Sequence, residues 1–101
     1  MRNENLKTGE RYARELVLIS QTHYIGKNWQ GNEKLIYRHV FTDGIFSYVY
    51  SGKNMRLTLG QKYHIRFTVK RQDTKYDITR MARLFLVKGI GNDSQEIFNL
   101  A

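Results

Sequence analysis

The chain contains no cysteine and no proline, and the first absence removes several classes of protein. Without cysteine there is no disulfide framework, no thiol nucleophile and no cysteine-ligated metal site. No stretch approaches the roughly 18 consecutive apolar residues of a membrane-spanning helix. Residues 1–5 are not followed by an apolar segment, so we expect no secretory signal and a cytoplasmic protein.

The lack of proline coincides with an abundance of aromatic residues. Disordered chains are usually rich in proline and poor in aromatics, whereas 13% of these 101 residues are aromatic. We therefore expect one folded domain over residues 1–101, with a barrel at about 12–88, an N-terminal arm at 1–11 and a C-terminal tail at 89–101. Its turns must be made by Gly, Asn and Asp.

Acidic residues are scarce, nine against 17 Lys and Arg, and the net charge is +8. Residues 27–88 hold thirteen basic and four acidic residues, a net charge of +9. The preceding 26 residues carry a net +1, and residues 89–101 carry −2. A basic body of this kind indicates a polyanion partner. The alternative is a solvated surface that serves only solubility.

Alternating apolar and polar residues predict β-strands and no long helix. Residues 63–70 alternate without a break. Residues 12–25 are a longer β-rich run in which residues 16–19 are apolar on both faces, as in a strand buried twice or bent to serve two sheets. Residues 35–41 and 45–50 flank Asp43-Gly44, a strong hairpin signal, and a fifth strand is expected over 78–87. At most one turn of helix is expected, at 52–59. These features predict an all-β protein, a small five-stranded antiparallel barrel of the OB-fold or SH3-like type.

The expected residue pairing of the hairpin places aromatic rings on one face. If Asp43-Gly44 is a two-residue turn, Thr42 lies opposite Ile45, and residues directly opposite share a face. That face then holds six rings: Tyr37, His39, Phe41, Phe46, Tyr48 and Tyr50. The rings either form the core or face solvent as a platform on which bases stack. We favour the platform, because Tyr and His tolerate water and branched aliphatics fit a small barrel interior.

Basic and aromatic residues also occupy the expected loops around this platform. Cations in these loops would neutralise phosphates, and Trp29 and Tyr76 would add stacking. The flanking candidates are Lys27, Trp29 and Lys34, then Lys53 and Arg56, then Lys70, Arg71, Lys75 and Tyr76.

Two segments resemble a known family. The hairpin with its aromatic second half, Ile45-Phe46-Ser47-Tyr48-Val49-Tyr50, precedes the run from Gly60 to Lys70 and then Ile78-Thr79-Arg80. Over about residues 12–88 this order resembles OB-fold single-stranded-DNA-binding proteins of bacteriophages and mobile genetic elements. The resemblance implies an OB-fold with a reduced helix between strands three and four. It also implies ligand contact on the face of strands two and three and in two loops, with Arg80 as a further contact.

The C-terminal tail departs from that family. Bacterial members end in a strongly acidic tail that recruits partners, whereas residues 91–101 contain only Asp93 and Glu96 as acids. We expect Ile97, Phe98 and Leu100 to pack on the barrel or on a second copy of the chain. Recruitment of a replication protein by this tail is the alternative.

The sequence predicts no catalysis, no cofactor and no metal. The spacing of His23, His39 and His64 matches no metal pattern, and the four acids of the body lie in separate expected loops. We expect largely sequence-independent binding of single-stranded DNA in phage or mobile-element replication or recombination, in a bacterial or phage-infected cell. The alternatives are an RNA-binding or translation-associated OB or SH3-like domain, and a protein-interaction module, such as an inhibitor, that uses the aromatic patch.

Overall fold

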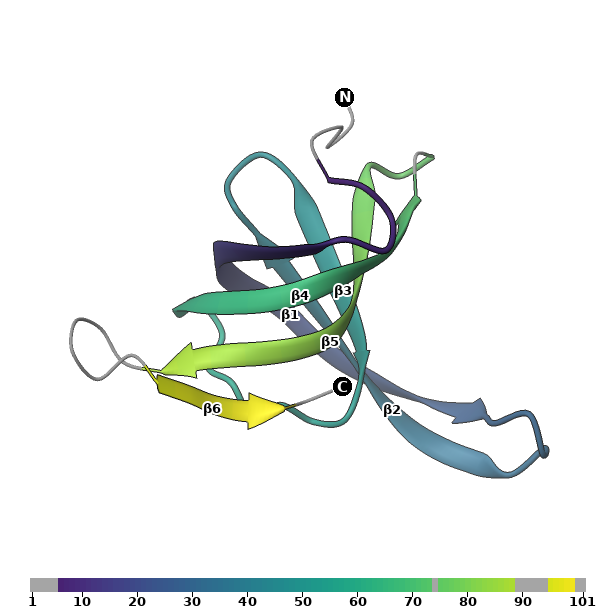
Figure 1. Cartoon of the computed structure of the whole chain (residues 1–101). Coiled ribbons are helices and arrows are strands. Elements are labelled where there is room, and N and C mark those ends of the chain that lie inside the picture. Colours follow the sequence, from purple (N-terminus) through teal and green to yellow (C-terminus); the bar gives the residue numbers. More distant parts are fainter. Residues whose placement is uncertain (1–5, 74, 89–94, 100–101) are drawn as a thin grey trace.

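The computed structural model describes residues 6–73, 75–88 and 95–99, which form an all-β protein (Figure 1). The strands are β1 (Arg11–Lys27), β2 (Glu33–Thr42), β3 (Ser47–Gly52), β4 (Lys62–Asp73), β5 (Ile78–Lys88) and β6 (Gln95–Asn99). The five predicted strands are all present, and each lies within a few residues of its expected bounds. The part of the chain that the structure describes contains no helix.

Five of the strands pair in a closed ring. β1 pairs with β2 and with β4, β2 pairs with β3, and β4 pairs with β5, all antiparallel. A parallel pairing of β3 with β5, from Ser47↔Ile78 to Val49↔Arg80, completes the ring. β6 adds to β5 as a sixth, antiparallel strand that the sequence did not predict. Packing of the tail through Ile97, Phe98 and Leu100 lies outside the described side chains.

The interior of the ring holds the hydrophobic core. Leu16 and Leu18 of β1 and Ile65 and Phe67 of β4 have no exposed surface, because every second residue of these strands points inward. Leu6, in the segment before β1, is only 3% exposed and belongs to the same cluster. The region expected to be a separate N-terminal arm therefore contributes to the core.

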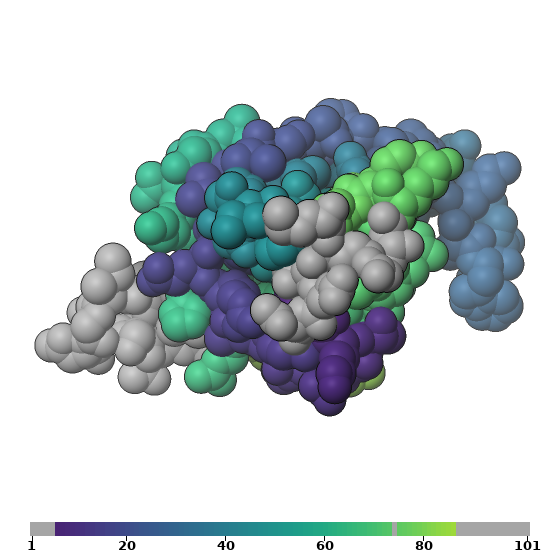
Figure 2. All heavy atoms as spheres, turned by 90° about the horizontal axis from the view of Figure 1, so that it is seen from above, coloured from purple at the N-terminus to yellow at the C-terminus, as the bar shows by residue number. Residues whose placement is uncertain are grey.

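β1 is long enough to serve two partners in succession. Its first part, Arg11 to Val17, pairs with β4, and its second part, Val17 to Lys27, pairs with β2. A β-bulge between Leu18 and Ser20 leaves Ile19 51% exposed, which agrees with the expected bend. Beyond the ring, β1 and β2 continue as a two-stranded projection (Figures 1 and 2). We call residues 24–36 of this hairpin the arm.

Two local predictions are wrong. The β2–β3 turn is a four-residue loop, 43–46, so that Thr42 lies opposite Ser47 rather than Ile45. The single helical turn expected at 52–59 is absent. Arg56 has a left-handed backbone, with φ of 56°, which a right-handed helix does not allow.

Candidate nucleic-acid interface

The aromatic face of the β2–β3 hairpin is the core and not an exposed platform. His39 and Phe41 have no exposed surface, and Tyr48 and Tyr50 are 1% and 6% exposed. The register differs by two residues from the predicted one, so these rings do share a face, as expected, but that face points inward. Burying such a side chain contributes roughly 1.5–3 kcal/mol to stability, and rings exposed on a platform would not make this contribution.

The other two rings of the predicted platform lie away from the buried four. Phe46 belongs to the 43–46 loop and is partly buried against the core. Tyr37 lies at the base of the arm, half-buried, with its ring 5.6 Å from that of His23. Neither forms a continuous stacking surface with its neighbours.

The outer face of β2 and β3 carries small and aliphatic residues. Val40 lies opposite Val49, and Arg38 lies opposite Ser51, on the face that does not carry the four buried rings. Arg38 is half-buried, and Val49 is only 2% exposed. This face therefore offers a cation but no ring to a ligand.

His39 is a satisfied core histidine. Its Nδ1 lies 3.2 Å from the carbonyl oxygen of Tyr50, and its Nε2 accepts the backbone N–H of Met55 at 3.2 Å. Burial lowers the pKa of His39, and the hydrogen bond to Tyr50 only partly opposes that shift. The ring is thus neutral and inaccessible to a base, and the predicted contact is wrong.

The arm presents Trp29 to solvent on a braced tip. Trp29 is 91% exposed. Beneath it, the side-chain oxygen of Asn28 accepts the backbone N–H groups of Gln30 and Asn32 at 2.9 and 3.0 Å. Gly31 donates its N–H to the Asn28 carbonyl at 2.9 Å from a left-handed backbone with φ of 85°. These bonds brace the backbone of the tip, and the exposed ring projects from this hydrogen-bonded turn.

Two lysines of the arm accompany the tryptophan. Lys27 ends β1 opposite Glu33, and Lys34 lies in β2 opposite Gly26. Both lysines are exposed, but they lie in strands and not in the loop in which they were predicted. The structure thus brings together Lys27, Trp29 and Lys34 on one projection.

The arm also exposes apolar side chains that the sequence analysis did not single out. Ile25 is 61% exposed and Leu35, directly opposite it, is 45% exposed. Tyr24, on the other face, is 46% exposed. The signal was present, because Tyr24-Ile25 and Leu35-Ile36 are successive apolar residues and so point to both faces, but only the tertiary structure places them beyond the ring (Figure 1).

The remaining predicted loops lie at different ends of the ring. Lys53 and Arg56 are exposed in the segment that follows β3, near the base of the arm, since Gly52 lies opposite Tyr37. Lys75 and Tyr76 are in the β4–β5 connection, beside the start of β3. The ten-residue β2 spans about 30 Å, and Lys75 and Tyr76 lie at its end farther from the arm, so the two groups do not meet.

The cations of the β4–β5 region differ in how their charge is balanced. Arg80 pairs with Asp73 at 3.4 Å and is half-buried, so its charge is compensated. Lys75 lies 5.3 Å from the ring of Tyr76, which is 62% exposed. Arg71 and Lys70 are exposed.

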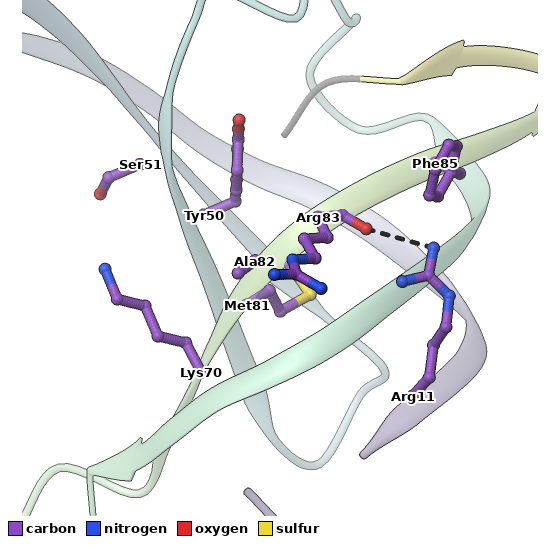
Figure 3. A pocket seen from close by; sticks show the side chains of 8 residues that line it. All are labelled: Arg11, Tyr50, Ser51, Lys70, Met81, Ala82, Arg83 and Phe85. Carbon is purple, nitrogen blue, oxygen red and sulfur yellow. Dashed lines mark hydrogen bonds between the residues drawn. The ribbon is translucent and has the colours of Figure 1, made fainter. Parts of the chain in front are cut away.

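A second basic cluster lines a cleft of about 700 Å³ on the side of the ring (Figure 3). Among the described residues its lining includes three cations and no carboxylate: Arg11, Tyr50, Ser51, Lys70, Met81, Ala82, Arg83 and Phe85. Tyr50 and Lys70 were predicted, but as members of different groups. Arg11, Arg83 and Phe85 were missed, because no local pattern shows that β1, β4 and β5 bring them together.

The described residues contain no cluster of three or more His, Asp or Glu side chains that could hold a metal ion. No helix in this part of the chain could cross a membrane.

Comparisons with protein-family models, with curated proteins and with solved structures gave no match. The function is therefore argued from the arm, the cleft and the charge of the chain itself.

Proposed function

We propose that the chain is an OB-fold protein that binds single-stranded DNA with little sequence preference. Supporting the fold assignment is the ring order β1-β2-β3-β5-β4, with β3 parallel to β5 and every other neighbouring pair in the ring antiparallel. The setting implied by the resemblance, replication or recombination of phage or mobile-element DNA in a bacterial cytoplasm, belongs to the same proposal.

The observation that carries the binding proposal is the braced, 91% exposed Trp29 at the tip of a basic arm. A ring this exposed contributes little to folding, whereas base stacking on an aromatic side chain is worth about 1–3 kcal/mol. Lys27 and Lys34 flank the tip on opposite faces of the hairpin, because the pairs Lys27↔Glu33 and Gly26↔Lys34 are adjacent, and each would neutralise a phosphate of a strand that passes the tip. The net charge of +8 favours approach to any polyanion, and the ring favours one whose bases are unpaired.

Trp29 is the only tryptophan, so its fluorescence reports directly on the arm. We expect a dT oligonucleotide to quench it, and quenching to weaken as salt is raised. For single strands, log K should fall with log salt by about 0.7 for each phosphate that is neutralised. Equal affinity for dT, rU and duplex DNA, or no binding to any of them, would overturn the proposal. If the protein instead prefers rU, the RNA-binding alternative is supported.

A matched set of lysine variants tests the role of the arm. Lys27→Gln and Lys34→Gln should each reduce the salt slope by about 0.7. Lys62→Gln, an exposed lysine of β4 outside the arm and the cleft, is the control and should leave the slope unchanged. Equal effects of all three substitutions would mean that net charge, and not the arm, determines binding.

A second candidate function rests on Ile25 and Leu35. These exposed aliphatic side chains lie opposite each other on the arm and have no π-face for a base. A protein partner would cover them, as in an interaction or inhibitor module. Ile25→Asp with Trp29 retained separates the two functions, because DNA binding would persist while docking of a protein on this surface would be lost.

A further inference from the structure

The cleft lies where one edge of β5 changes partners. That edge pairs with β3 from Ile78 to Arg80 and with β6 from Phe85 onward, while β4 occupies the other edge. No described strand pairs with residues 81–84 on the β3 and β6 side. The cleft opens over this interval, and Met81, Ala82 and Arg83 belong to its lining (Figure 3).

Two β-bulges place cations at this interval. Val69 lies opposite Met81 but Arg71 lies opposite Arg80, so Lys70 is the extra residue of β4. Farther along, the register passes from Thr68↔Ala82 to Arg66↔Phe85 and leaves an extra residue in β5 at 83–84. Bulges redirect side chains and are frequent beside functional sites. Here both irregularities put a cation on the wall of the same cleft.

Arg83 occupies a backbone conformation that side chains disfavour. Its φ is 51°, in the left-handed region where glycine is the favoured residue. A long cationic side chain at such a position costs stability, and strained positions of this kind cluster at ligand sites. The presence of arginine here is explained if its guanidinium binds a ligand in the cleft.

Arg11 is fixed at the cleft by neutral groups. Its guanidinium carbon lies 4.7 Å from the centre of the Phe85 ring, Nη1 donates to the Thr68 hydroxyl at 3.0 Å, and Nη2 donates to the Arg83 carbonyl at 3.4 Å. None of these partners carries a negative charge. Arginine has five N–H donors, so further donors remain for a ligand.

The three cations of the cleft therefore share an unbalanced charge. Within the described residues, Arg11, Lys70 and Arg83 form no ion pair with a carboxylate; Arg80, close by in β5, does so with Asp73. The lining thus supplies two guanidinium groups and one ammonium group together with the apolar side chains of Met81, Ala82 and Phe85. Guanidinium groups match the geometry of phosphate oxygens, and an ammonium adds a point charge.

We propose that this cleft is a phosphate-binding site, separate from the arm. The phosphate is either one in the backbone of a bound strand or one carried by a free phosphorylated ligand. The proposal goes beyond single-stranded-DNA binding, because inorganic phosphate alone should occupy the site whether or not the arm binds DNA.

The direct test titrates inorganic phosphate into the full chain at constant ionic strength, with chloride as the replaced anion. Nitrogen-15 NMR should show saturable shifts at the backbone of residues 81–84 and at the Nε–Hε groups of Arg11 and Arg83, and none at Trp29. Absence of saturable shifts up to about 10 mM phosphate, or equal shifts on the arm and in the cleft, would overturn the proposal.

Arg83→Gly provides a variant in which misfolding is not a concern. Glycine suits the left-handed φ at this position, so we expect the variant to fold at least as stably as the parent. Loss of one charge-assisted contact should weaken phosphate binding at least about tenfold. Lys70→Gln should act in the same direction. Arg71→Gln, which removes the neighbouring exposed cation outside the cleft, is the matched control and should bind phosphate as the parent does. Equal phosphate affinity of the parent and Arg83→Gly would contradict the site.

The source of the phosphate follows from the same variants. If Arg83→Gly also weakens dT binding and reduces its salt slope, the strand backbone supplies the phosphate. If dT binding is unchanged while phosphate binding is lost, the ligand is a free phosphorylated molecule. Both outcomes support phosphate binding in the cleft. If the parent protein does not bind dT, only the proposed function is contradicted.

Discussion

His39 and Met55 fasten the segment after β3 to the core: the imidazole Nε2 accepts the Met55 backbone N–H at 3.2 Å. Because Nε2 accepts, the neutral ring carries its proton on Nδ1, which donates to the Tyr50 carbonyl oxygen. A second proton on Nε2 would remove the bond to Met55 and create a charge in a site with no exposed surface. The position of this segment is therefore coupled to the protonation of one histidine.

We expect the protein to lose stability in mild acid because of His39. Burial lowers its pKa below the ordinary 6.5, so the unfolded chain binds a proton at a pH where the folded chain does not. The contribution is complete above pH 6.5 and is lost as the pH falls toward the lower pKa of the folded state. One proton gives at most about 1.4 kcal/mol per pH unit.

Urea unfolding between pH 5 and 8 measures this slope. The His39→Leu variant should show a smaller dependence on pH than the parent, whatever its absolute stability. The same slope in parent and His39→Leu would show that His39 has no part in the acid response.

Asp43 organises the loop between β2 and β3. Its Oδ1 accepts the N–H groups of Ile45 and Phe46, both at 2.8 Å, and its Oδ2 accepts the Tyr48 hydroxyl at 2.8 Å. Asp43→Ala removes all three bonds and should cost about 1–3 kcal/mol in urea unfolding. Asp43→Asn retains an acceptor for the backbone and should cost less. A parental urea midpoint for Asp43→Ala would contradict this role.

The Asp43 carboxylate should also contribute to the loss of stability at low pH. Burial alone would raise the pKa of Asp43, but the hydrogen bonds from Phe46, Ile45 and Tyr48 outweigh it and lower the pKa below 3.8. Its contribution is present above that pH and is lost as the pH falls through the lower folded value. In unfolding measured from pH 5 to 2, the parent and Asp43→Asn should converge.

Trp29 and Tyr48 should respond in opposite ways to truncation. Trp29→Ala removes a ring that is 91% exposed, so stability should change by no more than about 0.5 kcal/mol. Oligonucleotide affinity should fall by about 1–3 kcal/mol, or roughly 5- to 150-fold. Tyr48→Ala empties part of the core and should cost about 3–5 kcal/mol of stability. Calorimetry measures the stability of the two variants, and fluorescence polarisation of a labelled dT oligonucleotide, which does not depend on Trp29, measures their binding.

Leu6 tests whether the segment before β1 is part of the folded unit. It is 3% exposed within the core cluster, so Leu6→Ala should cost about 2–5 kcal/mol. Leu59→Ala is the control, because Leu59 is 59% exposed and should change stability by about 0.5 kcal/mol or less. Equal midpoints for Leu6→Ala and the parent would mean that this segment is dispensable.

Much of the fold could be predicted from alternation in the sequence. Residues 63–70 alternate without a break and lie within β4, and the Asp43-Gly44 signal does mark the β2–β3 hairpin. The loop is longer by two residues than predicted, and a shift of two preserves which residues share a face, because side chains alternate with a period of two. The grouping of His39, Phe41, Tyr48 and Tyr50 was therefore correct.

The sequence by itself determined the five strands of the ring, the sharing of faces and the concentration of positive charge in residues 27–88, since these depend only on local periodicity and composition. Only the tertiary structure decided which face of the hairpin is inside, because both faces are apolar and ring closure selects the one that fills the interior. It also decided the meeting of Arg11, Lys70 and Arg83, which depends on bulges in strands far apart in sequence. Long-range pairing sets such registers, and no local pattern encodes them.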